Sequence, residues 1–141
     1  MRHAAIGTAI LLFAGSAAAE QMTLYNVATD DRFVELGKEG GAGDMILWHS
    51  EVQDEAGNRL GTGAGTCIRL DAAGNHFCNL TIHHDGRGAI NASGMQAEEP
   101  APSALTIVGG TGDYQGITGT LRSTPVEDRA RFKYEIDYRT D

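Results

Sequence analysis

The sequence lacks any apolar run long enough to cross a membrane, and it is poor in positive charge. Its main apolar stretch, Ile6–Ala14, is far shorter than the roughly 20 residues that a transmembrane helix needs. Eleven Lys and Arg residues stand against 19 Asp and Glu residues, which gives a formal net charge of −8 at pH 7. We therefore predict no membrane insertion and no binding to nucleic acid or to anionic membrane surfaces, because these carry the same sign of charge.

Motifs for hydrolysis and metal binding are also missing. No Gly-x-Ser-x-Gly elbow is present, and no serine pairs with a suitable histidine and acid. His83 and His84 are adjacent, so on a strand they would point to opposite faces and could not share one metal. His49 and Glu51 would lie on one face of a strand and could form an acid–base pair, although an exposed polar face is the simpler interpretation. The sequence therefore predicts no metal site.

The first 19 residues have the pattern of an export signal. Arg2 supplies the charged start, Ile6–Ala14 the apolar core, and Ala17, Ala18 and Ala19 the small residues before a cleavage point. We expect cleavage near Ala19 and a secreted or periplasmic protein. Residues 20–141 then form a single domain, which is long enough to bury a core.

Short segments typical of strands, joined by turn residues, fill the rest of the chain, and no helix-length pattern occurs. The predicted strands are Thr23–Val27, Met45–Gln53, Leu60–Leu70, Phe77–His83, Ala89–Gln96, Leu105–Val108, Ile117–Leu121 and Phe132–Arg139. The stretch Asp30–Gly43 is predicted as a polar loop. This pattern favours an all-β fold, a closed eight-stranded antiparallel up-and-down barrel over about residues 22–139. Such a barrel holds packed side chains or one small ligand.

A glycine-rich stretch, residues 104–121, lies between the sixth and seventh predicted strands. Its structural motif consists of Gly109, Gly110, Thr111, Gly112, Tyr114 and Gly116. Glycines after a strand also occur in dinucleotide-binding turns, but those turns open a helix. Here the following residues, Ile117–Thr120, are poor helix formers. We therefore interpret the stretch as a corner in which glycines provide positive φ angles and close backbone approach.

The two cysteines lie on the arms of one predicted hairpin. If Leu70 and Asn75 close a four-residue loop, Cys67 and Cys78 face each other. Directly opposed residues have Cβ atoms about 4.5–5.5 Å apart, which a disulfide can span after a small adjustment. We predict a disulfide between them, which export would permit. A one-residue change in the turn would instead leave two free thiols.

Four blocks of sequence carry a family resemblance. They are Gly43–Met45, Gly57–Cys67, Gly88–Ile90 and Val108–Gly116. Their order and spacing resemble those of plant allene oxide cyclases, and the last block is also similar to the glycine-rich signature of dirigent proteins. The resemblance implies an eight-stranded barrel with a largely apolar cavity, often assembled as a homotrimer. It also implies action without a cofactor on a reactive hydrophobic small molecule, by positioning it and shielding it from water.

The resemblance also places residues in the cavity. In the plant cyclases the first strand carries a glutamate, which stabilises developing positive charge, and an asparagine; Asn26 and Ala28 stand at those positions here. Ser50 replaces an asparagine of the second strand. Because an amide cannot provide the charge of a carboxylate, we expect little or no plant-type cyclase activity.

Candidate site residues follow from these comparisons. Tyr25, Asn26, Trp48 and Ser50 are the candidate ligand-binding residues, and Asp44 and Glu51 are candidate catalytic carboxylates if they face the cavity. Trp48 is also interpretable as plain core or cavity wall. Two functions remain open: a cofactor-free cyclase, isomerase or dirigent-like protein, and a non-catalytic binding barrel like a lipocalin.

Overall fold

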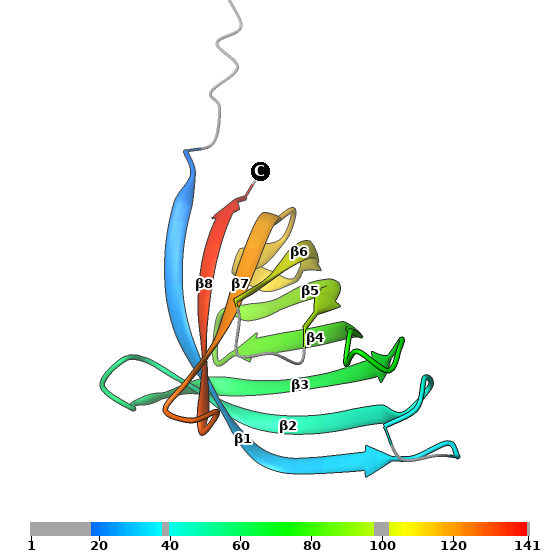
Figure 1. Ribbon diagram of the computed structural model, residues 1–141. Coiled ribbons are helices and arrows are strands. Elements are labelled where there is room, and N and C mark those ends of the chain that lie inside the picture. Colours follow the sequence, from blue (N-terminus) through cyan, green and yellow to red (C-terminus); the bar gives the residue numbers. More distant parts are fainter. Residues whose placement is uncertain (1–17, 38–39, 98–101, 141) are drawn as a thin grey trace, which may run out of the picture.

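The chain folds into a closed barrel of eight strands (Figure 1). The structure is a computed structural model that describes residues 18–37, 40–97 and 102–140. The strands are β1 (Glu20–Val34), β2 (Met45–Gln53), β3 (Arg59–Arg69), β4 (His76–His84), β5 (Gly88–Gln96), β6 (Ser103–Gly110), β7 (Thr118–Val126) and β8 (Arg131–Arg139). Almost all of the predicted export signal lies outside the described residues. In the part that is described, no helix has the length and apolar character needed to span a membrane.

Every strand pairs antiparallel with the next one, and β1 closes the barrel against β8. The predicted all-β, up-and-down antiparallel barrel is confirmed. β1 makes closure possible because it is long and curved: Glu20–Asn26 pairs with β8, whereas Tyr25–Val34 pairs with β2. Figure 1 shows this change of partner along the bend of β1.

The first strand is longer than the sequence predicts. A polar loop was expected from Asp30 onward, but β1 continues to Val34. Its register with β2 shifts between Ala28 and Asp30, which marks a β-bulge. A bulge adds a residue and bends the strand, so the acidic segment can pair with β2 while most of its side chains stay exposed. The sequence prediction was wrong here because polar residues on an exposed strand look like a loop.

The core consists of residues that alternate along each strand and point into the barrel. The least exposed aliphatic side chains are Val52, Ile82, Ile90, Leu105, Leu121 and Ile136. All but Leu105 come from strand segments toward the end of the barrel that holds the glycine-rich corner. This end is filled by side chains, and space remains toward the opposite end.

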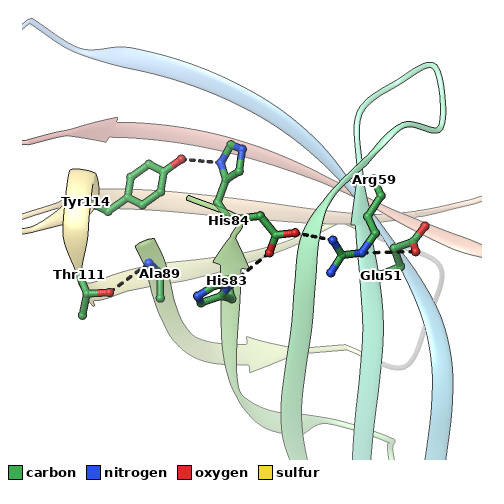
Figure 2. Close-up of polar contacts among 8 residues, drawn as sticks. Glu51, Arg59, His83, His84, Ala89, Thr111 and Tyr114 are labelled. Atoms are coloured by element: carbon green, nitrogen blue, oxygen red, sulfur yellow. Dashed lines mark hydrogen bonds and ion pairs between the residues drawn. The ribbon is translucent and has the colours of Figure 1, made fainter. Parts of the chain in front are cut away.

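The glycine-rich corner closes the packed end of the barrel. It contains a single turn of 3₁₀ helix, η1 (Gly112–Tyr114), whose Tyr114 ring is buried. Thr111 is tied to β5 by two hydrogen bonds: its N–H donates to Ala89 O at 2.9 Å, and Ala89 N–H donates to its Oγ1 at 3.1 Å (Figure 2). Gly112 has φ +63°, and a Cβ there would overlap the carbonyl oxygen of Arg87. The predicted structural corner is therefore present.

Cys67 and Cys78 are joined by a disulfide, as the register argument predicted. They face each other across the β3–β4 pair, and Leu70 N–H donates to Asn75 O at 2.7 Å to close the hairpin. Both sulfurs are on the inner face of the barrel, where Cys67 is 7% and Cys78 is 1% exposed. The disulfide thus belongs to the interior of the barrel.

Candidate ligand-binding cavity

A cavity of about 620 Å³ occupies the end of the barrel away from the glycine-rich corner. Its wall comes from the end of β1, the starts of β2, β4 and β8, and the ends of β3 and β5. Apolar and aromatic side chains form most of the inner wall: Ile46, Trp48, Leu80, Phe132 and Tyr134. This volume is within the range of about 300–1,000 Å³ that is usual for small-molecule sites.

Trp48 fits into the cavity wall because the residue opposite it on β3 is a glycine, which has no side chain. Trp48 on β2 pairs directly with Gly65 on β3. A Cβ at residue 65 would overlap Cζ2 and Cε2 of the indole, and it would lie 2.8 Å from Nε1. The glycine therefore lets the indole lie across the neighbouring strand. Trp48 is part of the cavity wall, one of the two roles that the sequence allowed.

A buried polar pair lies beside the tryptophan. Ser50 Oγ donates a hydrogen bond to Asn26 Oδ1, and both residues are 4% exposed. Gly63 provides the room, since a Cβ there would overlap Ser50 Oγ and would lie 2.8 Å from Asn26 Oδ1. Asn26 lines the cavity directly. With Oδ1 engaged, the amide nitrogen of Asn26 remains as a donor.

Tyr134 is the most buried ionisable group of the cavity wall. Its side chain is 3% exposed, and burial raises the pKa of its phenol well above the ordinary value of 10.0. No hydrogen bond or charge contributes to that pKa shift. The phenol is therefore protonated at all physiological pH values and is a hydrogen-bond donor.

The disulfide and two polar residues form another part of the wall. Cys67, Cys78, His76 and Gln96 all line the cavity, and His76 is 8% exposed. Gln96 Oε1 lies 3.2 Å from Cys78 Sγ, and its Nε2 donates to Ser123 Oγ at 3.3 Å. Sequence reasoning missed His76 and Gln96 as cavity residues. Their position on the same face as Cys78 would have identified them once the inward face was known.

Charged residues surround the mouth of the cavity. They are Asp31, Glu35, Asp44, Arg69 and Arg129. The carboxylate of Asp44, a candidate catalytic residue, accepts hydrogen bonds from the backbone N–H groups of Leu36 at 2.8 Å and Gly41 at 3.0 Å. These contacts show how Asp44 holds the segment between β1 and β2 at the rim of the cavity.

Two other candidates from the sequence lie on the outer face of the barrel. Glu51 accepts a hydrogen bond from Gln53 Nε2 at 2.7 Å and lies 3.7 Å from the guanidinium of Arg59 (Figure 2). Tyr25 is covered by the guanidinium of Arg131, whose Cζ is 4.6 Å from the ring centroid. Neither residue is part of the cavity wall. The structure thus brings together Asn26, Trp48 and Ser50, and it separates Glu51 and Tyr25 from them.

A second polar cluster lies at the packed end of the barrel. His84 Nδ1 is 2.7 Å from the Tyr114 hydroxyl (Figure 2). The guanidinium of Arg87 lies 5.1 Å from the centre of the tyrosine ring. Burial and the charge of Arg87 lower the pKa of His84 below its ordinary value of 6.5. Tyr138 Oη donates to Glu20 at 2.9 Å nearby. These contacts fasten the corner to β1, β4 and β8.

Metal coordination finds no support in this geometry. Across the described ranges, no group of three or more His, Cys, Asp or Glu side chains is arranged to hold a metal ion. The chemistry available in the cavity comes instead from the phenol, the amide, the imidazole and the aromatic walls.

The sequence matches the family model of the allene oxide cyclase barrel like domain over residues 21–137. The chain belongs to this family. Among curated protein sequences, no match is found. The family resemblance inferred from the four sequence blocks is therefore confirmed, and it covers nearly the whole barrel.

Solved structures of a demethylase, a Diels-Alderase and a dirigent protein share the fold. A pyocyanin demethylase superposes with a TM-score of 0.76 at 29% identity, covering 84% of this chain and 99% of that one. An exo-specific intermolecular Diels-Alderase has a TM-score of 0.70 at 13% identity, covering 86% and 98%. A pterocarpan synthase dirigent protein has a TM-score of 0.70 at 15% identity, covering 99% and 98%. The last two likenesses show the fold alone.

Proposed function

We propose that this barrel binds one small, largely apolar molecule in its 620 Å³ cavity and controls the course of its reaction without a cofactor. The observation that carries the proposal is the cavity itself: aromatic walls from Trp48, Phe132 and Tyr134 surround a few buried polar groups. That combination is typical of sites in which apolar surface gives affinity and polar groups fix orientation.

A flat, ring-containing ligand suits these walls best. Aromatic side chains stack on planar ligands with more affinity than area burial alone provides. The pyocyanin demethylase, at 29% identity and with nearly full coverage of its own chain, is named for an aromatic substrate. We extend that chemical class to this cavity, without assigning the same compound.

Positioning and hydrogen-bond donation are the chemistry that the cavity residues can supply. A ligand held between Trp48 and Phe132 would be shielded from water and restricted to few conformations, which lowers the entropic barrier of a cyclisation or rearrangement. The phenol of Tyr134, whose pKa is raised by burial, stays protonated and is available as a hydrogen-bond donor. The described buried residues of the cavity wall include no carboxylate, so stabilisation of a cation by a buried charge is not part of the proposal.

A non-catalytic carrier is the second candidate. Two features favour it: Glu51 lies on the outer face, and the Asp44 carboxylate is engaged by backbone N–H groups at the rim, so neither candidate catalytic carboxylate is a free group inside the cavity. In either case we propose an exported protein, since the disulfide and the apolar N-terminal stretch agree with an oxidising compartment.

Tryptophan fluorescence tests the binding proposal directly. Trp48 is the one tryptophan of the chain and lines the cavity, so its emission responds to a ligand bound there. Its ring also borders a shallow outer pocket that includes Thr81, so the variants below are needed to separate the two positions. Titration with phenazine and with palmitate should give saturable quenching, with the flat aromatic compound binding more tightly. Native mass spectrometry of the purified protein should also detect any ligand retained from the host.

A matched pair of variants separates cavity binding from surface binding. Leu80→Phe fills the cavity, whereas Thr81→Phe adds the same ring to the outer face of the same strand. We expect phenazine affinity to fall at least about tenfold in Leu80→Phe, a loss of about 1.4 kcal/mol, and to be unchanged in Thr81→Phe. Equal effects of the two variants, or no saturable binding to the wild-type protein, would refute the proposal.

A further inference from the structure

Two hydrogen-bond donors in the cavity have no hydrogen-bond partner among the residues that the structure describes. The Tyr134 hydroxyl forms no hydrogen bond with any described residue, although Tyr134 is only 3% exposed. In the part of the chain that the structure describes, Arg131 Nε is the one fully enclosed side-chain nitrogen or oxygen without a partner. The phenolic hydroxyl is therefore not walled in by protein atoms, and it opens onto the cavity that Tyr134 lines.

Asn26 presents the second donor. Its Oδ1 accepts the hydrogen bond from Ser50 Oγ, which fixes the amide with its nitrogen directed away from Ser50. Among the described residues, that nitrogen has no hydrogen-bond partner, and it is not an enclosed atom. Asn26 is 4% exposed and lines the same cavity as Tyr134. Its amide N–H groups are thus available to a ligand inside the barrel.

The barrel register places these donors side by side. Across the β1–β8 pair, Leu24 faces Tyr134 and Asn26 faces Phe132. Asn26 and Tyr134 are therefore diagonal neighbours on the inner face, about 7–8 Å apart, with their Cβ atoms somewhat closer. Two side chains of this length at that spacing can converge on a single atom between them.

We propose that Tyr134 and Asn26 together bind an oxygen acceptor of the ligand, so that the ligand class is a flat apolar molecule carrying a carbonyl oxygen, as in a quinone or an aromatic ketone. The inference rests on the proposed function, because it concerns the same cavity. A buried donor without a partner is costly, and a ligand oxygen that accepts from both donors removes that cost. A pure hydrocarbon of the same shape leaves both donors unsatisfied.

The same two donors have a consequence for reactivity. Hydrogen bonds to a carbonyl oxygen withdraw electron density and stabilise negative charge that develops on it during addition or enolisation. Neither residue needs to transfer its proton for this effect. The site would therefore activate a carbonyl-bearing substrate while the aromatic walls hold its carbon skeleton.

Fluorenone and fluorene test the inference, because they share a flat tricyclic shape and differ in the carbonyl group. Affinities are measured by quenching of Trp48 in the wild-type protein, in Tyr134→Phe and in Tyr25→Phe, a matched tyrosine on the outer face. We expect the wild-type protein and Tyr25→Phe to bind fluorenone about tenfold more tightly than fluorene. In Tyr134→Phe this preference should fall to about twofold, while fluorene affinity stays the same or rises.

Two further measurements separate recognition from structural damage. Because the Tyr134 hydroxyl has no hydrogen bond to lose among the described residues, Tyr134→Phe should melt at the same temperature as the wild-type protein or higher. The infrared carbonyl band of bound fluorenone should shift to lower frequency in the wild-type protein and return toward its value in apolar solvent in Tyr134→Phe. The conservative change Asn26→Asp, which removes the N–H donors, should also reduce the preference for the ketone.

The outcomes distinguish the inference from the function on which it rests. Equal binding of fluorenone and fluorene by the wild-type protein, or an unchanged ketone preference in Tyr134→Phe, would overturn the inference and leave cavity binding intact. If neither tricycle binds and phenazine and palmitate also fail to bind, the proposed function is wrong and the inference falls with it.

Discussion

The indole of Trp48 lies over Gly65, the residue directly opposite it on the neighbouring strand. A methyl group at residue 65 would occupy the space of the indole ring, so the tryptophan and the glycine depend on each other. The cavity wall at this point is therefore set by the absence of a side chain on β3 as much as by the ring on β2.

Gly65→Ala should displace the indole. Overpacking of this kind costs about 1–3 kcal/mol of folding stability. We expect that loss in denaturant unfolding, together with a shifted Trp48 emission maximum and weaker binding of phenazine. Thr62→Ala, a change on the exposed face of the same strand, serves as the control and should alter none of the three. Unchanged emission in Gly65→Ala would show that the ring does not rely on this glycine.

The disulfide should contribute stability because it closes a loop with a sequence separation of 11 residues. The chain-entropy relation gives about 3 kcal/mol or slightly less for such a loop. The free energy of unfolding of the Cys67→Ala/Cys78→Ala double variant should therefore be lower by that amount, and the variant should unfold at a lower denaturant concentration. Reductant should destabilise the wild-type protein and leave the double variant unaffected. Thiol titration of the denatured, unreduced wild-type protein should find no free thiol.

The position of this disulfide adds a second expectation. Both cysteines line the cavity, so their removal also changes the wall that the ligand contacts. Phenazine affinity should consequently differ between the wild-type protein and the double variant at a temperature where both are folded. Identical affinities would place the ligand away from the β3–β4 wall.

The sequence predicted the barrel and the disulfide because both depend on local patterns. Turn residues such as Asp71–Gly74 determine the register of the hairpin, and register in turn decides that Cys67 meets Cys78. The end of β1 was not predictable in this way, since the bulge near Ala28 has no signal in the composition. β7 was also longer than predicted, because Pro125 lacks a backbone N–H and argues against a strand.

The candidate site was only partly predictable for a different reason. Period-two alternation divides each strand into two faces but does not say which one is inside. Tyr25 and Asn26 are neighbours, so only one of them could face the cavity. In the closed barrel Asn26 is on the inner face and lines the cavity. His76 and Gln96 were missed because they stand near strand ends, where the sequence gives no indication of a wall.

Stability should fall as the pH decreases through 6.5, owing to His84. Burial beside Arg87 lowers the pKa of His84 in the folded state below the ordinary 6.5 of the unfolded chain. Between these two pKa values the unfolded chain binds a proton that the folded chain does not, so acidification favours unfolding. The contribution of His84 to the free energy of unfolding is complete above pH 6.5 and is lost as the pH falls. Below the folded-state pKa no further loss occurs.

Denaturant unfolding between pH 7.5 and 5.5 measures this dependence. His84→Gln should flatten the curve, and His49→Gln, a change of an exposed histidine on β2, serves as the control. The carboxylates of Asp54 and Asp71 act in a separate, more acidic range, because hydrogen bonds from Asn58 and Asn75 lower their pKa values below 3.8. A slope that persists in His84→Gln would assign the effect to other groups.

Allene oxide cyclase activity of the plant type should be absent or very low, because Asn26 stands where the sequence resemblance places the charge-stabilising glutamate. Asn26 is buried, lines the cavity and already uses its Oδ1 to accept from Ser50, so it offers N–H groups rather than negative charge. A neutral amide in place of a carboxylate would forgo several kcal/mol of stabilisation of a cationic transition state, and each 1.36 kcal/mol is about tenfold in rate. A chiral product assay with an allene oxide generated in place should therefore give the racemic product of spontaneous cyclisation. Stereoselective product formed well above that background would show that the barrel enforces the reaction through shape alone.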